Sequence, residues 1–190
     1  MEMRWISGVS RGRLGLISVM LAATSLSACV QTAPEEAMSF AAPPMQWDHH
    51  PQAEEWTEST LVALSTKDPI LSEHVPADIE SWCPGYAEAP VEERRAFWAG
   101  LLSAVARYES TWNPAASGGG GRWIGLMQIS PRSAANYGCE ATSVNALKDG
   151  EQNLECAVEI MSTQVAKDGM VAGGGNRGIG RDWAPLRSSE

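Results

Sequence analysis

Two long segments of the chain carry apolar residues at the three- and four-residue spacing of a helix. In the first, Phe97, Leu101 and Val105 repeat this spacing, and Pro90 suits the first turn of a helix, where a backbone donor would stay unpaired anyway. In the second, apolar residues recur from Leu154 to Val165, and Gly169 suits the position after a helix end. The pattern predicts helices over about residues 90–111 and 151–168.

Shorter elements are predicted around these two helices. Residues 53–66 and the stretch from Ser130 to Gly138 read as short helices, and small β elements are expected at "RWIGLMQIS" after the glycine run at 117–121. Inward-facing residues of the first short helix are expected to be Trp56, Leu61 and Leu64. Three prolines then allow only short elements before residue 90: Pro69, Pro76 and Pro84. The predicted class is mainly α, a single domain with small β elements.

The first 28 residues have the pattern of an export signal. A basic start with Arg4, Arg11 and Arg13 precedes an apolar run of about fifteen residues that ends in small residues, which is too short for a comfortable bilayer span. The segment from Leu26 to Cys29 resembles the lipobox of bacterial lipoproteins. That resemblance implies cleavage before Cys29 and acylation of its thiol, whereas the alternative is an ordinary signal peptide followed by a chance cysteine.

The chain is therefore divided into three parts: a lipoprotein signal peptide at 1–28, a flexible tether at 29–52 and a domain at 53–190. The tether is assigned because its residues are rich in Ala, Pro and Gln. We expect a periplasmic protein held to the membrane through the lipid at Cys29. Val30, rather than Asp, follows the cysteine, and by analogy with such lipoproteins this favours the outer membrane.

The charge balance excludes one class of partner. The formal net charge is −9, and loss of the basic leader makes the remaining chain more acidic still. Binding to nucleic-acid phosphates calls for a basic surface, so we expect no nucleic-acid partner. Attraction to anionic lipid is also expected to be weak, which leaves the lipid anchor as the means of membrane attachment. We expect a monomer.

Four cysteines are present, and their state depends on Cys29. If Cys29 is acylated, three remain in an oxidising compartment, and we predict a bridge between Cys139 and Cys156 that leaves Cys83 free. If it is not acylated, four cysteines allow three pairings. The spacing of the Cys and His residues does not support a metal site.

Glu109 is a candidate catalytic acid because of its place on the first long helix. On a helical wheel it falls between Trp98 and Leu102, within the predicted apolar arc. That arc is predicted to contain Phe97, Trp98, Leu101, Leu102, Val105 and Tyr108, with Ser103, Arg107 and Ser110 on the far side. A buried carboxyl has a raised pKa and can serve as a proton donor. The alternative is that the helix frays at Glu109, with Asn113-Pro114 just beyond, and that the acid is solvated or acts as a cap.

Four motifs in order, "ESTWNP", "GLMQIS", "NYG" and "NLECA", resemble those of lytic transglycosylases with the soluble-transglycosylase domain. The resemblance covers about residues 80–187 and implies a goose-type-lysozyme-like fold and a peptidoglycan glycan substrate, without a metal or cofactor. It gives Glu109 the role of sole acid and base and Ser110 a supporting role. The further site residues that it implies are Gly125, Leu126, Met127, Gln128, Tyr137 and Asn153.

The chain departs from this family pattern at two places. Many members have a Met two residues after the Gln, where this chain has Ser130, and many have a late Tyr-containing motif, where this chain reads "VAGGGNRGIG". Tyr137 is a possible source of the hydroxyl, although helix packing explains it equally well. Among the tryptophans that can either stack on sugars or pack in the core, Trp123 beside the glycine run is the best sugar-binding candidate.

The expected function is cleavage of the β-1,4 bond between N-acetylmuramic acid and N-acetylglucosamine, with 1,6-anhydromuramic ends as products. One carboxyl suffices because the muramic acid supplies its own 2-acetamido and 6-hydroxyl groups, and attack within one ring has a high effective molarity. Two alternatives remain open: a hydrolytic muramidase, and a non-catalytic cell-wall-binding lipoprotein that keeps the fold.

Overall fold

The computed structural model describes residues 44–187. The helices are α1 (Ala53–Ser65), α2 (Val91–Ser110), α3 (Pro131–Tyr137), α4 (Val144–Leu147) and α5 (Gly150–Asp168). Short 3₁₀ helices are η1 (Ile79–Ser81), η2 (Tyr86–Glu88), η3 (Ile179–Arg181) and η4 (Ala184–Leu186). The strands are β1 (Ser117–Gly118), β2 (Trp123–Ile124), β3 (Ala172–Gly173) and β4 (Arg177–Gly178). The predicted class, mainly α with small β elements, is confirmed.

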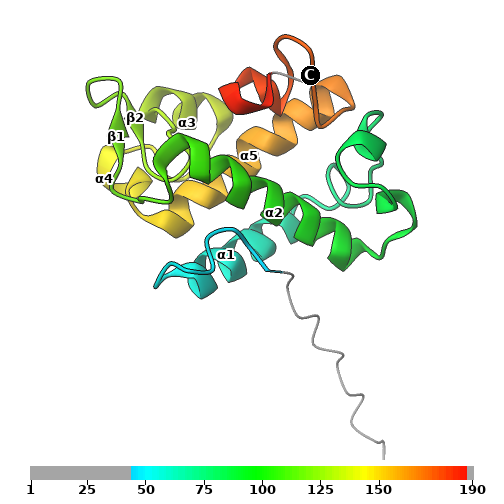
Figure 1. The fold of residues 1–190 in the computed structure, drawn as a ribbon. Helices are drawn as coiled ribbons and strands as arrows, with labels where there is room; N and C mark the ends of the chain where they lie inside the picture. Colours follow the sequence, from blue (N-terminus) through cyan, green and yellow to red (C-terminus); the bar gives the residue numbers. More distant parts are fainter. Residues whose placement is uncertain (1–43, 188–190) are drawn as a thin grey trace, which may run out of the picture. The chain divides into compact units, whose positions relative to one another are not determined.

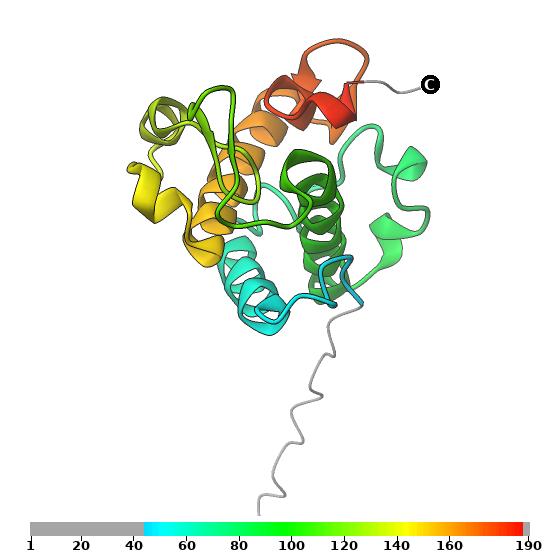
Figure 2. The same ribbon diagram turned by 60° about the vertical axis from the view of Figure 1, so that its left-hand side comes forward.

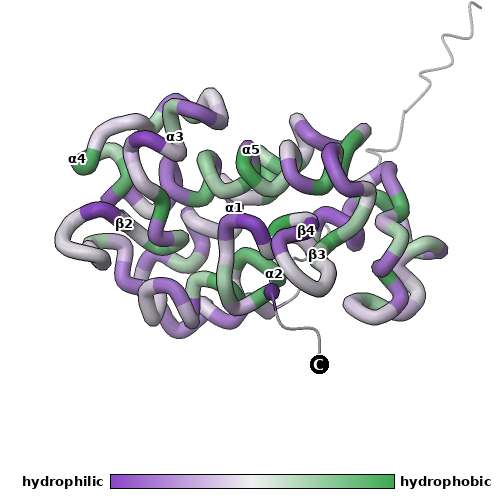
Figure 3. The backbone as a smooth tube through the Cα atoms, turned by 90° about the horizontal axis from the view of Figure 1, so that it is seen from above, coloured by the Kyte–Doolittle hydropathy of each residue, from purple (hydrophilic) through white to green (hydrophobic). Residues whose placement is uncertain are grey.

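Helix α1 packs against both long helices, α2 and α5, and α5 also contacts α3, α4 and η3 (Figures 1 and 2). The two hairpins, β1–β2 and β3–β4, are antiparallel and only two residue pairs long. Helix α5 buries an apolar stripe that includes Leu154, Met161 and Val165, and the tube in Figure 3 changes between hydrophobic and hydrophilic colours along it. The core therefore lies among α1, α2 and α5.

Side chains at the helix ends account for where several helices begin. Asp149 accepts a hydrogen bond from the backbone N–H of Gln152 at the start of α5, and Ser130 accepts one from Ser133 at the start of α3. Gly138 and Gly169 follow the two helices in the left-handed conformation. The predicted position of Pro90 was one residue off, since it precedes α2 rather than opening it. These local signals explain why most of the predicted helix ends are close to the observed ones.

The segment before α1 belongs to the fold, so the predicted tether over 29–52 ends too late. Trp47 has no exposed surface and Met45 is 5% exposed. The backbone N–H of Trp47 donates to Ser103 Oγ at 3.1 Å, and its indole N–H donates to Thr57 Oγ1 at 2.9 Å. The Pro-rich composition gave no sign that Trp47 would be buried, and burial of this side chain fixes the chain from about residue 45 onward.

The same segment corrects the predicted faces of α2. Ser103, expected to face solvent, is fully buried because the residues around Trp47 cover it. Tyr108, expected on the buried arc, is 71% exposed. The helical wheel assumed one covered face, whereas α2 is covered on more than one side by segments that lie far away in the sequence.

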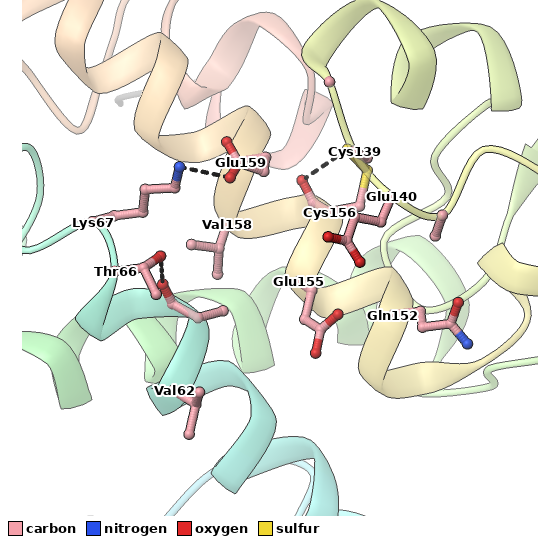
Figure 4. Close-up of a pocket in the computed structure, with 13 residues that line it drawn as sticks. Val62, Thr66, Lys67, Cys139, Glu140, Gln152, Glu155, Cys156, Val158 and Glu159 are labelled. Atoms are coloured by element: carbon pink, nitrogen blue, oxygen red, sulfur yellow. Dashed lines mark hydrogen bonds and ion pairs between the residues drawn. A yellow bond between two sulfur atoms is a disulfide. The ribbon is translucent and has the colours of Figure 1, made fainter.

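A disulfide joins Cys139, which follows α3, to Cys156 in α5 (Figure 4). Cys83 is half-buried and forms no disulfide with another described residue. Residues 44–187 contain no helix that is both long enough and apolar enough to cross a membrane. Within that same range, no three His, Cys, Asp or Glu residues gather in a group that would hold a metal ion. Cys29 and the predicted signal peptide lie outside the described residues.

Candidate active site

Glu109 lies in the last turn of α2, and its side chain is half-buried. Burial raises the pKa of Glu109 above its usual value, because the charged form loses hydration, and the positive charge of Arg187 opposes that shift. No hydrogen bond to another described residue contributes to the shift. Burial therefore favours the protonated form of this carboxyl, and its oxygens form no hydrogen bond with the part of the chain that the structure describes.

The chain turns sharply just after Glu109. Thr111 and Trp112 both have left-handed backbone conformations, with φ of 53° and 56°. The N–H of Trp112 donates to Ala106 O, six residues earlier, at 3.3 Å, and its indole N–H donates to Ser103 O at 3.0 Å. Residues other than glycine adopt this backbone only at a cost. The turn ends α2 immediately after the carboxyl and directs the chain into the β1–β2 hairpin.

The "GLMQ" residues form a tight turn that continues this hairpin. Gly125 has a φ of 79°, and a Cβ at this position would collide with Leu147 O and the amide of Asn153. The ends of the turn pair through the backbones of Ile124 and Ile129, and Gln128 has a left-handed φ of 46°. Glycine is thus required at 125 both for its backbone angle and for the close approach of α5.

Asn153 stabilises this turn through hydrogen bonds to its backbone. It is fully buried at the start of α5, and its Oδ1 accepts from Met127 N at 2.8 Å. Its Nδ2 donates to Ile124 O at 3.1 Å and to Leu147 O at 2.8 Å. Asn153 therefore satisfies three backbone groups and positions the turn, rather than offering its own side chain to a ligand.

Several residues predicted to bind substrate use their polar atoms within the protein. Ser110 Oγ donates to Ala106 O at 3.1 Å in its own helix, and Gln128 Nε2 donates to Gly125 O at 2.9 Å in its own turn. Met127, like Leu126, has no exposed surface. Trp123, in contrast, is 40% exposed and is the predicted sugar-stacking residue with the most accessible surface.

A small pocket lies beside the turn. Its lining residues are Trp123, Met127, Gln128, Ile129, Ser130, Ser133, Ile160, Asp182 and Trp183. Trp183 is 2% exposed and donates its indole N–H to Met127 O at 3.1 Å, which ties the C-terminal segment to the turn. Ser130, which stands where many relatives have a Met, caps α3 with its hydroxyl. The pocket thus unites the β1–β2 hairpin, the turn and the C-terminal segment.

Tyr137 points its hydroxyl toward Asp182. The Tyr137 OH lies 3.0 Å from Asp182 Oδ2 and accepts a hydrogen bond from Gln164 Nε2 at 2.6 Å. Burial and the adjacent carboxylate raise the pKa of Tyr137 to about 12. The hydroxyl remains protonated at neutral pH and is engaged in this network, and Tyr137 is not among the residues that line the pocket.

Sequence reasoning missed two residues of this region, Arg187 and Asp182. Arg187 donates to Gly180 O at 2.8 Å and to Arg181 O at 3.1 Å, and these bonds hold its guanidinium where it acts on Glu109. Both residues come from the "RDWAPLR" stretch, which the sequence places more than 70 residues after Glu109. Figures 1 and 2 show this C-terminal segment close to the C-terminal end of α2.

A larger groove of about 370 Å³ lies between α1 and α5 and is separate from these residues (Figure 4). Its walls carry Glu140, Glu155 and Glu159, and Lys67 forms an ion pair with Glu159 at 2.6 Å. Among the predicted site residues, only the two disulfide cysteines line it. The groove therefore does not contain the candidate acid.

The fold agrees with a known family. Residues 89–189 match the family model of the transglycosylase SLT domain, which is more than half of the chain. The chain therefore belongs to the transglycosylase SLT domain family, a class of glycan-processing enzymes. No curated protein matches the chain significantly in sequence.

Among solved structures, those of DslA (Bd0314) resemble this protein. A glutamate-to-glutamine mutant of DslA superposes with a TM-score of 0.72 and is 31% identical over 79% of this chain and 90% of that one. Its wild-type form 2 and a mutant at a different glutamate each give a TM-score of 0.71 at the same identity and coverage. The likeness covers nearly all of DslA, and DslA-like structures support the lysozyme-like fold.

Proposed function

We propose that this protein is a peptidoglycan lytic transglycosylase that uses Glu109 as its single acid and base. The reaction would cleave the β-1,4 bond from N-acetylmuramic acid to N-acetylglucosamine and leave 1,6-anhydromuramic ends. One observation carries the proposal: in a member of the SLT family, the carboxyl at the end of α2 is half-buried, has a raised pKa and makes no hydrogen bond to a described residue. Such a group is suited to give a proton to an incoming oxygen.

The proposed chemistry begins from the protonated form of this carboxyl, which burial favours. Glu109 gives its proton to the glycosidic oxygen, the bond from that oxygen to C1 of the muramic acid breaks, and the 2-acetamido oxygen stabilises positive charge at C1. The 6-hydroxyl of the same sugar then attacks C1, while the Glu109 carboxylate accepts the hydroxyl proton. Intramolecular attack of this kind reaches effective molarities of about 10⁵–10⁸ M, so no water has to be held.

Hydrolysis is the second candidate, because Asp182 brings another carboxylate to the wall of the pocket beside Gln128. Ordinary glycosidases use a second carboxylate as nucleophile or to activate water. Asp182 gives hydrolysis limited support, since Tyr137 and Gln164 both donate hydrogen bonds to its Oδ2 and hold the carboxylate in place. A hydrolytic muramidase would leave reducing muramic acid instead of the anhydro form.

Product analysis distinguishes the two reactions. Purified sacculi are digested with the leaderless protein, and the soluble fragments are analysed by mass spectrometry. We expect the fragments to end in 1,6-anhydromuramic acid, which is lighter by one water than the reducing end. Fragments with reducing muramic acid would contradict lytic transglycosylation in favour of hydrolysis. Sacculus binding without release of fragments would favour a non-catalytic wall-binding protein.

The proposed location is the periplasm, with the lipid at Cys29 holding the enzyme at the outer membrane. Support comes from the basic leader, the apolar run and the lipobox-like residues before Cys29. Because the fold begins near Met45, the stretch from Cys29 to Pro44 would form the spacer to the membrane.

A further inference from the structure

We propose that Asp182 binds substrate: its carboxylate accepts a hydrogen bond from an N–H or O–H group of the glycan at the pocket beside Trp123. This inference rests on the proposed function for the identity of the ligand, a peptidoglycan glycan strand. It adds a specificity-determining residue that none of the four motifs "ESTWNP", "GLMQIS", "NYG" and "NLECA" contains.

The Asp182 carboxylate is held in one orientation by two residues from different helices. Tyr137, at the end of α3, places its hydroxyl 3.0 Å from Oδ2, and Gln164, in α5, donates its Nε2 to the same oxygen at 2.7 Å. Gln164 is 4% exposed, and its other side-chain atom, Oε1, has no described partner. Only the amide nitrogen can donate to a carboxylate, so the Gln164 amide keeps the orientation that points Nε2 at Asp182 and Tyr137.

One oxygen of this carboxylate keeps spare capacity. Among residues 44–187, Oδ2 has two close hydrogen-bond donors, whereas Oδ1 has one, the hydroxyl of Tyr137 at 3.2 Å. That hydroxyl has a single proton, which it shares between the two oxygens. Each carboxylate oxygen can accept about two hydrogen bonds. Oδ1 is therefore free to accept at least one more from a ligand.

The pocket that Asp182 lines suits one substituent of a sugar. Its volume is about 30 Å³, which is enough for a hydroxyl or part of an acetamido group but not for a whole ring. Trp123, which is 40% exposed, also lines this pocket, and its indole offers a face for the ring itself. An acceptor with no donor of its own selects N–H and O–H groups, which the substituents of this glycan supply.

Tyr137 and Gln164 are then positioning residues, because they act on the substrate only through Asp182. Removal of the Tyr137 hydroxyl takes away the hydrogen-bond donor that the structure describes for Asp182 Oδ1 and lets the carboxylate rotate. The expected consequence is weaker glycan binding with the ring of Tyr137 still packed. A role in stability alone would lower the unfolding temperature without changing the affinity for glycan.

The test measures binding rather than turnover. In the Glu109→Gln background, the dissociation constant for a stem-free tetrasaccharide of alternating N-acetylglucosamine and N-acetylmuramic acid is measured by calorimetry. Adding Asp182→Asn keeps the shape but weakens the acceptor, and we expect about a tenfold or greater loss of affinity, since hydrogen bonds to charged groups are the strong ones. Adding Tyr137→Phe instead is expected to give a smaller loss in the same direction.

The control is Glu140→Gln, which removes one negative charge from the exposed surface of the separate groove between α1 and α5. This substitution should leave the dissociation constant unchanged. If Asp182→Asn and Tyr137→Phe also bind within twofold of the parent, the proposal for Asp182 is wrong. Thermal unfolding of each variant, measured alongside, identifies any that fails to fold, and Tyr137→Phe then decides the question.

Parallel digestion of sacculi by the wild type separates this proposal from the proposed function. Digestion with unchanged binding in Asp182→Asn contradicts the role of Asp182 alone. No digestion, together with weakened binding in Asp182→Asn, contradicts the enzyme activity and supports the glycan-binding role. A parent protein that binds no glycan overturns both.

Discussion

At Glu109, burial and a nearby cation act on the same carboxyl in opposite directions. Burial raises its pKa, and the guanidinium of Arg187 lowers it. An acid that must give and then take back a proton works best with a pKa near the working pH, so both influences matter to the rate. The position of Arg187 depends on its hydrogen bonds to the carbonyls of Gly180 and Arg181.

Arg187→Gln is expected to move the pH profile of the enzyme. Loss of the positive charge lets burial raise the pKa of Glu109 further, and activity falls only when the pH rises through that pKa. The alkaline limb of kcat/KM should therefore shift to higher pH, which turbidity assays on sacculi at low ionic strength would measure.

The matched control for this charge effect is Arg187→Lys, which keeps the cation and should leave the alkaline limb close to that of the wild type. An alkaline limb that stays fixed in Arg187→Gln, or moves to lower pH, would show that Arg187 does not act on the titration of Glu109.

Thr111 carries local strain beside the candidate acid. Its φ of 53° and ψ of 42° are left-handed, and a β-branched residue is poorly suited to them. Thr111→Gly should stabilise the protein by about 1 kcal/mol, because glycine adopts this conformation freely at a helix end. Urea unfolding measures the change, with Thr111→Ala as the control that retains most of the strain. A glycine variant less stable than wild type would contradict the assignment of strain.

Individual residues were predicted from the sequence where the signal is local. The wheel placed Glu109 close to apolar neighbours, and Glu109 is indeed half-buried. It failed at Ser103 and Tyr108, since their exposure depends on which distant segment covers α2. No local pattern in the sequence marks Asp182 or Arg187, because the proposed role of each depends on residues that folding brings near it.

Among the elements, the turn after β2 and the start of α5 depend on each other. Gly125 makes room for Asn153, and Asn153 in turn bonds the backbone of the turn. The helices themselves were predictable, because caps and apolar spacing lie within each segment. The three-dimensional role of the "GLMQ" turn was known only through resemblance, since no local pattern says that α5 supports it.

The segment before α1 is the element whose importance the sequence concealed. Trp47 is fully buried, and its backbone N–H donates to Ser103 Oγ in α2. Nearby, the ring of His49 packs edge-on against the ring of Trp112, with 4.6 Å between the ring centroids. This segment therefore supports the turn that follows Glu109. It also explains why the folded part begins before the predicted boundary at residue 53.

Trp47→Ala is expected to destabilise the protein by about 3–5 kcal/mol, the usual cost of removing a buried tryptophan. Trp47→Phe, which keeps most of the buried volume but loses the bond to Thr57, should cost clearly less. Urea unfolding of the leaderless protein measures both. A loss below about 1 kcal/mol in Trp47→Ala would restore the view that this segment is a tether.

At the scale of the whole molecule, charge and attachment have to be considered together. The net charge of −9 gives the protein little attraction to an anionic membrane surface, so a lipid anchor would do this work. Cys29→Ser should abolish incorporation of labelled fatty acid and release the protein from the membrane fraction. Cys83→Ser is the control that should change neither. Continued acylation of Cys29→Ser would contradict the assignment of the anchor.

The central claim is that one carboxyl, at position 109, carries the chemistry of the whole protein. The most direct measurement compares the release of soluble fragments from sacculi by the wild type and by Glu109→Gln. The variant should fold and be at least as stable at neutral pH, because burial disfavours the charged form that it lacks. The account predicts a loss of rate of about 10²-fold or more, as for removal of a general acid. Digestion by Glu109→Gln at the wild-type rate would contradict it.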